Sequence, residues 1–238
     1  MWQSVAQWAV LPLLAEDAMT RPIQTLSTNE ETASAGNVKV TRDDWLEAAM
    51  ELLVRHGVSE VKILTLGKKL NVSRSSFYWY FQSRKDLLNQ LLAEWKRKNT
   101  DVVVRYAEMP AATITEAVCN FFRCIIAPDG FDYRLDFAVR EWARRDARVS
   151  QVIARSDEIR HQALTRMFER FGYSPEDADI RARVLYYQQI GYYALELSET
   201  LATRVSRVEG YLKCFTGVEP SQQEIDSFIE FARTVEQS

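Results

Sequence analysis

The sequence predicts an all-α protein, in which an N-terminal three-helix domain of helix-turn-helix type precedes a larger helical domain. Only 8 of the 238 residues are glycine and 6 are proline, which leaves little material for a turn-rich β fold. Apolar residues recur at intervals of three and four, the spacing of one helix face. Side chains that can cap helix starts precede these runs at Thr41, Ser83, Thr113, Ser174 and Ser221.

Residues 1–38 are expected to form an N-terminal extension that is partly disordered. Residues 1–18 are apolar, but they lack a basic start and Pro12 interrupts them, so they make a poor secretory signal. Two interpretations stay open: Met19 is the true start, or residues 1–18 form a docking helix. Residues 20–38 are rich in Thr, Ser, Asn and Glu, a composition typical of disorder.

The first helix of the domain is expected from Thr41 to about His56. Thr41 and Asp44 have the spacing of a capping box, and Gly57 follows the last apolar position. A second capping pair, Ser83 and Asp86, begins a long helix that continues through residues 87–95. This helix is expected to link the first domain, residues 39–88, to the second domain, residues 89–238.

Between these helices, residues 64–88 have the pattern of two short helices joined by a tight turn. Leu66 and Leu70 form an apolar stripe, Asn71 suits a left-handed turn, and Ser73 can cap the next helix. Phe77 and Phe81 lie four residues apart and share one face, so they are expected to anchor the second helix in the core. Polar and aromatic neighbours are then turned outward, namely Arg74, Ser75, Tyr78 and Trp79. Helix-turn-helix DNA-binding domains are built in this way.

Charge is concentrated in the same part of the chain. Residues 61–98 contain nine Lys or Arg and two acidic residues, a local charge of +7, whereas the whole chain carries −3. A basic segment on an acidic body is expected to attract phosphate at one end of the molecule. Arg84 and Lys85 lie in the first turn of the long helix, where backbone N–H groups also favour a phosphate.

The pattern from Trp45 to Leu92 resembles the N-terminal domain of the TetR/AcrR family of bacterial transcriptional regulators. The shared features are the turn at residues 70–73, a short helix ending in Tyr78-x-x-Phe81, a following basic residue and a leucine pair. Asn71 replaces the glycine that is usual in the turn. Residues 134–146 and 181–195 are similar to stretches in the ligand-binding halves of some members, with less specific motifs.

The resemblance implies a cytoplasmic, homodimeric regulator that binds a palindromic double-stranded DNA operator and is released by a small-molecule effector, most often as a repressor. Arg74 is expected to contact a base edge, while Tyr78 and Arg84 hold phosphates. An arm containing Lys39 and Arg42 would touch the minor groove. The full set of expected DNA contacts is Lys62, Arg74, Ser75, Ser76, Tyr78, Trp79, Tyr80, Arg84 and Lys85. Activation of transcription, effector-independent regulation and a helical protein-interaction module remain alternatives.

The second domain is expected to contain further helices at residues 113–126, 132–145, 148–171, 175–198 and 221–235. The helix from Pro175 is apolar nearly all round between Val184 and Leu197, so it must be covered on two sides. Together with the last helix it resembles the family's four-helix dimer interface. Ile190 and Ile229 are therefore expected at or near the dimer seam.

An effector pocket in this domain follows from the resemblance, and aromatic residues beside Arg140 are candidates to line it. Arg140 could orient a carboxylate beside apolar walls. The alternative is that Arg140 pairs with Asp136 on the surface while the rings pack in the core. The candidate pocket residues are Phe121, Phe137, Arg140, Trp142, Tyr186 and Tyr187.

Signals for catalysis, metals or cofactors are sparse. No phosphate-binding glycine loop, zinc-protease motif or nucleophile elbow occurs. Glu158 and His161 have a spacing possible for metal ligands, but a surface pair is the favoured interpretation. The three cysteines are expected to be buried thiols. The sequence therefore predicts no enzyme, no cofactor, no metal and no membrane helix.

Overall fold

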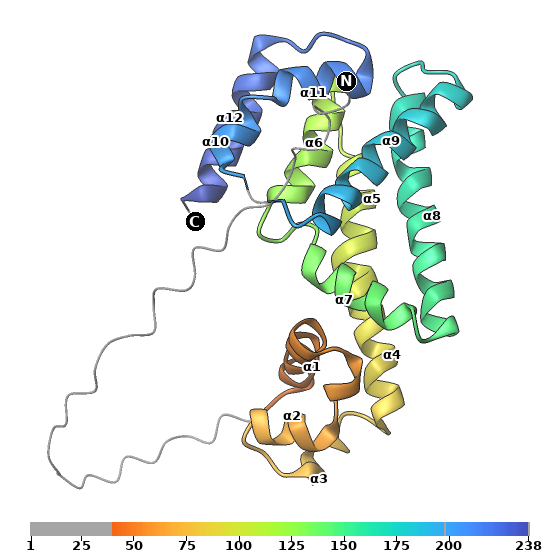
Figure 1. Ribbon diagram of the computed structural model, residues 1–238, viewed down its shortest axis with the longest axis vertical. Helices are drawn as coiled ribbons and strands as arrows, with labels where there is room; N and C mark the ends of the chain where they lie inside the picture. Colours follow the sequence, from red (N-terminus) through yellow and green to blue (C-terminus); the bar gives the residue numbers. More distant parts are fainter. Residues whose placement is uncertain (1–39, 198, 238) are drawn as a thin grey trace, which may run out of the picture.

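The computed structural model describes residues 40–197 and 199–237, and every regular element in these ranges is helical (Figure 1). The expectations for the N-terminal extension and for Lys39 lie outside the described residues. No helix in these ranges has both the length and the apolar composition needed to cross a bilayer. Figure 1 shows α1, α2 and α3 together at one end, with α4 leading from them into the larger group of helices.

The N-terminal domain packs the first three α-helices against the fourth, which leads on into the second domain. The expected capping box is confirmed, because Thr41 Oγ1 accepts from the Asp44 amide and the Asp44 carboxylate accepts from the Thr41 amide at 2.6 Å. Ser83 likewise caps α4 through the Asp86 amide. The elements are α1 (Arg42–His56), the 3-10 turn η1 (Val58–Glu60), α2 (Ile63–Lys69), α3 (Arg74–Phe77) and α4 (Arg84–Trp95).

The connection between the domains is a single helical rod with an irregular centre. The α4 helix continues without a break through the π-helical segment η2 (Lys96–Asp101) into α5 (Val102–Ala107). Asn99 and Thr100 of η2 are buried, and Asn99 Nδ2 donates to the Asp132 carbonyl at 2.7 Å. The rod is therefore attached to the second domain at its irregular turn.

Beyond α5, the second domain contains seven helices among the described residues. All of the expected helix starts are confirmed, including the Ser221 and Glu224 capping box. Figure 1 shows α8 and α9 side by side, with α10, α11 and α12 grouped on the other side of α6. The helices are α6 (Ile114–Ile126), α7 (Tyr133–Ala143), α8 (Ala147–Glu169), α9 (Pro175–Ala194), α10 (Leu201–Val205), α11 (Val208–Thr216) and α12 (Gln222–Glu236).

Two apolar cores lie on either side of α7. The first contains Trp45, Phe77 and Trp95, and it also takes in Leu135 and Trp142 from α7. The second is formed mainly by α5, α6, α8, α9, α11 and α12. The core of the helix-turn-helix domain is thus completed by residues far beyond position 88.

Several local expectations are wrong. The helix from Pro175 ends at Ala194 rather than near residue 198, because Glu196 takes a left-handed backbone angle, φ 49°. The α10 and α11 helices were not expected. Ser73 makes no side-chain cap to α3; its hydroxyl lies 2.8 Å from that of Ser75 instead. Cys214 is exposed, whereas Cys119 and Cys124 are buried.

The expected surface pair of Glu158 and His161 is also wrong. His161 is buried between α8 and α9, and its Nε2 lies 3.3 Å from a carboxylate oxygen of Asp179. Glu158 instead accepts from Gln162 at 2.6 Å. Within the described ranges, no cluster of three potential metal-ligating side chains occurs.

Candidate nucleic-acid interface

The turn between α2 and α3 brings the two helices close together. Asn71 adopts φ 53°, the left-handed conformation expected for it, and the Val72 amide donates to the Gly67 carbonyl at 3.0 Å. A Cβ atom on Gly67 would lie 3.2 Å from the Val72 carbonyl oxygen. Gly67 therefore permits this close approach, a role that the sequence alone did not indicate.

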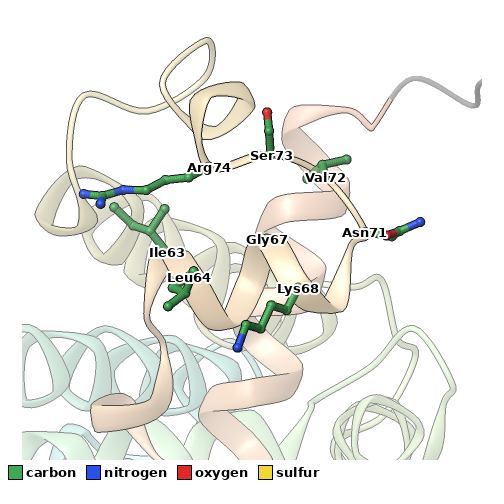
Figure 2. A pocket seen from close by; sticks show the side chains of 8 residues that line it. All are labelled: Ile63, Leu64, Gly67, Lys68, Asn71, Val72, Ser73 and Arg74. Atoms are coloured by element: carbon green, nitrogen blue, oxygen red, sulfur yellow. The ribbon is translucent and has the colours of Figure 1, made fainter.

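A hollow of about 410 Å³ lies between the two helices on the outer side of the domain. Figure 2 shows Arg74 extending from the start of α3 toward Ile63, while Lys68 projects from α2. Leu64, also on α2, is 62% exposed. The surface here combines two cations with apolar side chains. Its lining consists of Ile63, Leu64, Gly67, Lys68, Asn71, Val72, Ser73 and Arg74.

The α3 helix is held by its inward aromatic face. Phe77 is fully buried, stacks on Phe81 with ring centroids 5.1 Å apart, and meets the edge of Trp45 at 5.3 Å. Burial of this face turns Tyr78 and Trp79 outward, where they are 49% and 75% exposed. The end of α3 thus presents two large aromatic side chains to solvent, close in sequence to the exposed Arg74.

Arg74 has a defined position on this surface. Its Nη2 donates to the Tyr78 hydroxyl at 3.2 Å, one helical turn away, and its guanidinium lies 6.0 Å from the centre of the Tyr78 ring. Both side chains remain exposed. The tyrosine thus supports the arginine in an orientation from which it can reach a ligand.

The cations of this region differ in what they already contact. Lys62 pairs with Glu60 at 3.0 Å and Lys69 with Glu51 at 2.8 Å. No described carboxylate lies within ion-pair distance of the exposed side chains of Lys68, Arg74 and Lys85. These three cations are consequently available for phosphate oxygens.

Other expected contact residues already make bonds within the domain. Arg84 donates from Nε to the Val61 carbonyl and from Nη2 to the Val58 carbonyl, both at 2.6 Å. The hydroxyl of Tyr80 donates to the Val40 carbonyl at 2.8 Å, and that of Ser76 donates to the Ser73 carbonyl at 2.8 Å. These bonds give the three side chains a structural role, while Ser75 remains exposed.

Arg140 belongs to a largely buried charge network, in which all three guanidinium nitrogens already have partners. It donates to Asp136 at 2.8 Å and to both carboxylate oxygens of Asp157 at 2.9 and 2.6 Å. Burial would raise the pKa of Asp157, but the bond from Arg140 holds this pKa below its ordinary value. The expected pairing with Asp136 therefore exists, but placing it on the surface was wrong, because Asp136 is fully buried.

A second arginine completes this network. Arg160 is fully buried and its Nη2 lies 2.9 Å from Asp136, whose other donors include Trp95 Nε1 at 3.0 Å. Arg160 also donates to Thr100 at 3.1 Å and to the Tyr186 hydroxyl at 3.0 Å. The network thus ties α4 and η2 to α7, α8 and α9.

The remaining pocket candidates do not meet in one cavity. Phe121 lies in the core, while Tyr187 is 54% exposed on α9. Phe137 borders a hollow of about 510 Å³, and Trp142 borders a different one of about 400 Å³ beside the end of α1. The candidate dimer residues Ile190 and Ile229 are half-buried against their own core.

Comparison with known proteins agrees with this geometry. Residues 46–91 match the family described as bacterial regulatory proteins, tetR family. The HTH-type transcriptional regulator SrpR of Pseudomonas putida is 32% identical over 60 residues, 25% of this chain and 28% of SrpR. The probable acrEF/envCD operon repressor of Escherichia coli K12 is 31% identical over 51 residues, 21% of this chain and 23% of that protein. The similarity thus spans only about a quarter of these curated relatives.

Solved structures share the fold over a greater length. A transcriptional regulator from Aquifex aeolicus VF5 superposes with a TM-score of 0.57 at 16% identity, covering 73% of this chain and 98% of that chain. AmtR of Mycobacterium smegmatis gives 0.51 at 18% identity, covering 84% and 95%. Fold and site together define an all-helical helix-turn-helix protein. The match of residues 46–91 to the tetR family of bacterial regulatory proteins confirms the resemblance over this N-terminal segment.

Proposed function

We propose that the protein is a homodimeric transcriptional regulator that binds a palindromic DNA operator through α2 and α3. The observation that carries this proposal is the exposed surface of Arg74, Tyr78 and Trp79, fixed by the buried Phe77. Arg74 reads a base edge in the major groove, and Lys68 and Lys85 neutralise phosphates on either side. Such a regulator reads the DNA sequence with few side chains, and its cations add affinity for DNA by neutralising phosphates.

A binding experiment with the full chain tests the proposal. Fluorescence anisotropy is measured on labelled duplexes that tile the DNA flanking its gene, against a scrambled duplex at the same salt concentration. We expect one palindromic duplex to bind at least tenfold more tightly than the scrambled one, with affinity that falls as salt rises. Equal binding to every duplex, or none to any, would refute sequence-specific recognition.

Dimerisation is supported by the outer face of α9. Ile180, Val184 and Tyr187 follow helical spacing on this face and are each about half exposed, at 51%, 52% and 54%. A stripe of large apolar side chains in water is unfavourable, and a second copy would cover it. The two-fold axis of such a dimer would present two α3 helices to successive half-sites of an operator.

We further propose repression with release by an effector. A curated relative is named a probable operon repressor, and its similarity to this chain lies in the DNA-binding domain. The rod from α4 to α5 enters both apolar cores, so a ligand that moves the second domain would reposition the DNA-binding domain. Transcription from an operator-fused reporter, with and without the gene for this chain, distinguishes repression from activation.

A further inference from the structure

One large apolar side chain of α2 lies in solvent. Leu64 is 62% exposed and belongs to neither of the two apolar cores of the described residues. Leu66 and Gly67, later in the same helix, are buried where α2 packs against α1 and α3. A single exposed leucine is common on protein surfaces, so the surroundings of Leu64 decide whether it has a function.

The surroundings of Leu64 combine an apolar wall with two cations. Leu64 lines the 410 Å³ hollow between α2 and α3 together with Ile63, Lys68 and Arg74. Ile63 packs against the core of the domain, so it and Leu64 form the wall. Lys68 lies four residues after Leu64 and shares its helix face. No described carboxylate pairs with Lys68 or Arg74.

The start of α2 is the part of the helix that lies nearest to the reach of Arg74. Ile63 and Leu64 are the first two residues of α2. Figure 2 shows the Arg74 side chain crossing from the start of α3 toward Ile63, with Leu64 next along α2. A partner that contacts the Arg74 guanidinium therefore also meets the apolar wall.

The mixture of groups restricts the chemistry of that partner. A purely apolar partner would remove Lys68 and Arg74 from water without a counter-charge, which is unfavourable. A small anion would pair with the cations but would gain nothing from the leucine. The major groove of DNA offers both kinds of group, because guanine N7 and O6 accept from arginine and the C5-methyl group of thymine is apolar.

We propose that Leu64 determines sequence specificity by contacting the C5-methyl group of a thymine next to the base that Arg74 reads. Adjacent base pairs are stacked about 3.4 Å apart, so two side chains that line one hollow can meet neighbouring pairs. The contact favours thymine over cytosine, which has no methyl group. The inference rests on the proposed function and deepens it, because it makes α2 a second element that reads bases beside α3.

This assignment gives α2 a role beyond positioning. In helix-turn-helix proteins the first helix of the motif ordinarily crosses the DNA backbone, and the second helix reads the bases. Lys68 of α2 fits the ordinary role, since a lysine neutralises a phosphate. Leu64 does not fit it, because a leucine side chain has no group that binds a phosphate.

The test removes one methyl group from the DNA and leaves every polar group in place. The operator is selected with the full chain from a library of random duplexes, and each thymine of one half-site is then replaced in turn by deoxyuridine. Fluorescence anisotropy gives the dissociation constants for the wild type, Leu64→Ala, Leu64→Met and Lys68→Ala. Leu64→Met is the conservative variant, because methionine is apolar and similar in volume. The readout is the ratio of two constants on one protein preparation, which does not depend on the fraction that is folded.

We expect one thymine position at which deoxyuridine weakens wild-type binding about fourfold, the equivalent of one buried CH₂ group. Leu64→Ala should bind both duplexes equally at this position, whereas Leu64→Met should retain the preference for thymine. Lys68→Ala should weaken both duplexes alike and leave their ratio unchanged. Leu64→Ala should also melt at the temperature of the wild type, because the side chain is exposed.

Two results would overturn the inference. A preference for thymine that persists in Leu64→Ala would assign the methyl contact to another residue, and equal binding of the wild type to every deoxyuridine duplex would exclude such a contact. Specific binding to the selected operator together with either result would leave the proposed function intact. A library that yields no preferred sequence would refute both the proposed function and the inference.

Discussion

At the scale of single residues, the proposed DNA-binding surface depends on which side chains of α3 are buried and which are exposed. Phe77 is buried and fixes the helix, whereas Arg74 and Tyr78 are exposed and contact each other. The sequence predicted this division because spacings of three and four are local. It could not predict that Arg84 bonds to two carbonyls more than 20 positions earlier, because such contacts depend on the tertiary fold.

Replacement of Arg74 by alanine should reduce operator affinity by about 1–3 kcal/mol and relax discrimination between operator variants, because a bidentate contact to guanine is lost. Lys85→Ala is the matched comparison: it should weaken all duplexes alike and reduce the salt dependence. Both are measured by anisotropy on the operator and on single-base variants. Wild-type affinity and discrimination in Arg74→Ala would remove this residue from the recognition surface.

The buried network is the second feature determined by single residues. Asp136 accepts from Trp95, Arg140 and Arg160, so Asp136→Ala would leave Arg160 without its closest carboxylate. Loss of one partner of a buried ion pair costs about 3–5 kcal/mol, and Asp157 at 3.5 Å from Arg160 offsets part of this. We expect a decrease of about 3 kcal/mol in the free energy of unfolding.

Urea denaturation followed by circular dichroism measures this effect. Glu141→Ala is the control on the same helix, because Glu141 is exposed and pairs with Arg144 on the surface. Its effect should remain within about 0.5 kcal/mol. A similar, small change in both variants would show that the network contributes little to stability.

At the scale of elements, helix starts were more predictable than helix ends. Capping by Thr41, Ser83, Thr113, Ser174 and Ser221 is a local interaction, and all five residues cap as expected. The end of α9 was not predictable, because the residues that follow it contain no glycine or proline to mark a helix end. The burial of Arg160 was equally hidden, since its neighbours along α8 are mostly polar.

The proposed homodimer can be tested by a substitution on the outer face of α9. Val184→Arg would place a charge in the middle of the proposed interface, and desolvation of an unpaired charge is unfavourable. We expect this variant to be a folded monomer with weak operator binding, as measured by light scattering and anisotropy. Glu169→Arg, at the exposed end of α8, should leave the dimer intact.

Ile229→Arg tests the part of the dimer seam that was predicted from sequence on the last helix, beside the seam proposed on the outer face of α9. Ile229 packs against its own core, so this variant should lower the melting temperature as well as disturb any interface. A stable Ile229→Arg monomer together with a dimeric Val184→Arg variant would place the interface on α12 instead of α9. Circular dichroism melts of both variants provide the necessary comparison.

At the scale of the whole molecule, the DNA-binding domain is not an independent unit. Its core includes Leu135, Val139 and Trp142 of α7 and Val149 and Ile153 of α8. A fragment of residues 40–95 would expose the surfaces that these side chains cover. The sequence placed the boundary at residue 88 because motifs mark the helix-turn-helix but do not show what closes its core.

We therefore expect the isolated fragment 40–95 to be largely unfolded at room temperature, since a chain this short buries little surface even when it is complete. The full chain should instead lose the signals of both cores in one transition, followed by tryptophan fluorescence and circular dichroism. A fragment that melts cooperatively near the temperature of the full chain would contradict this prediction.

The π-helical segment η2 sets the rotation of α5 relative to α4 about the axis of the rod. Each residue of an α-helix turns the chain by about 100°, and a π turn contains one extra residue. Deletion of one residue between Lys96 and Asp101 could restore a regular α-helix, and every later side chain of the rod would then rotate by about 100° relative to α4. If Trp95 kept its hydrogen bond to Asp136, Thr100 would be turned away from Arg160 and would lose the hydrogen bond that joins them. The rotation of the second domain about the axis of the rod, relative to the helix-turn-helix domain, thus depends on a single amino acid in η2.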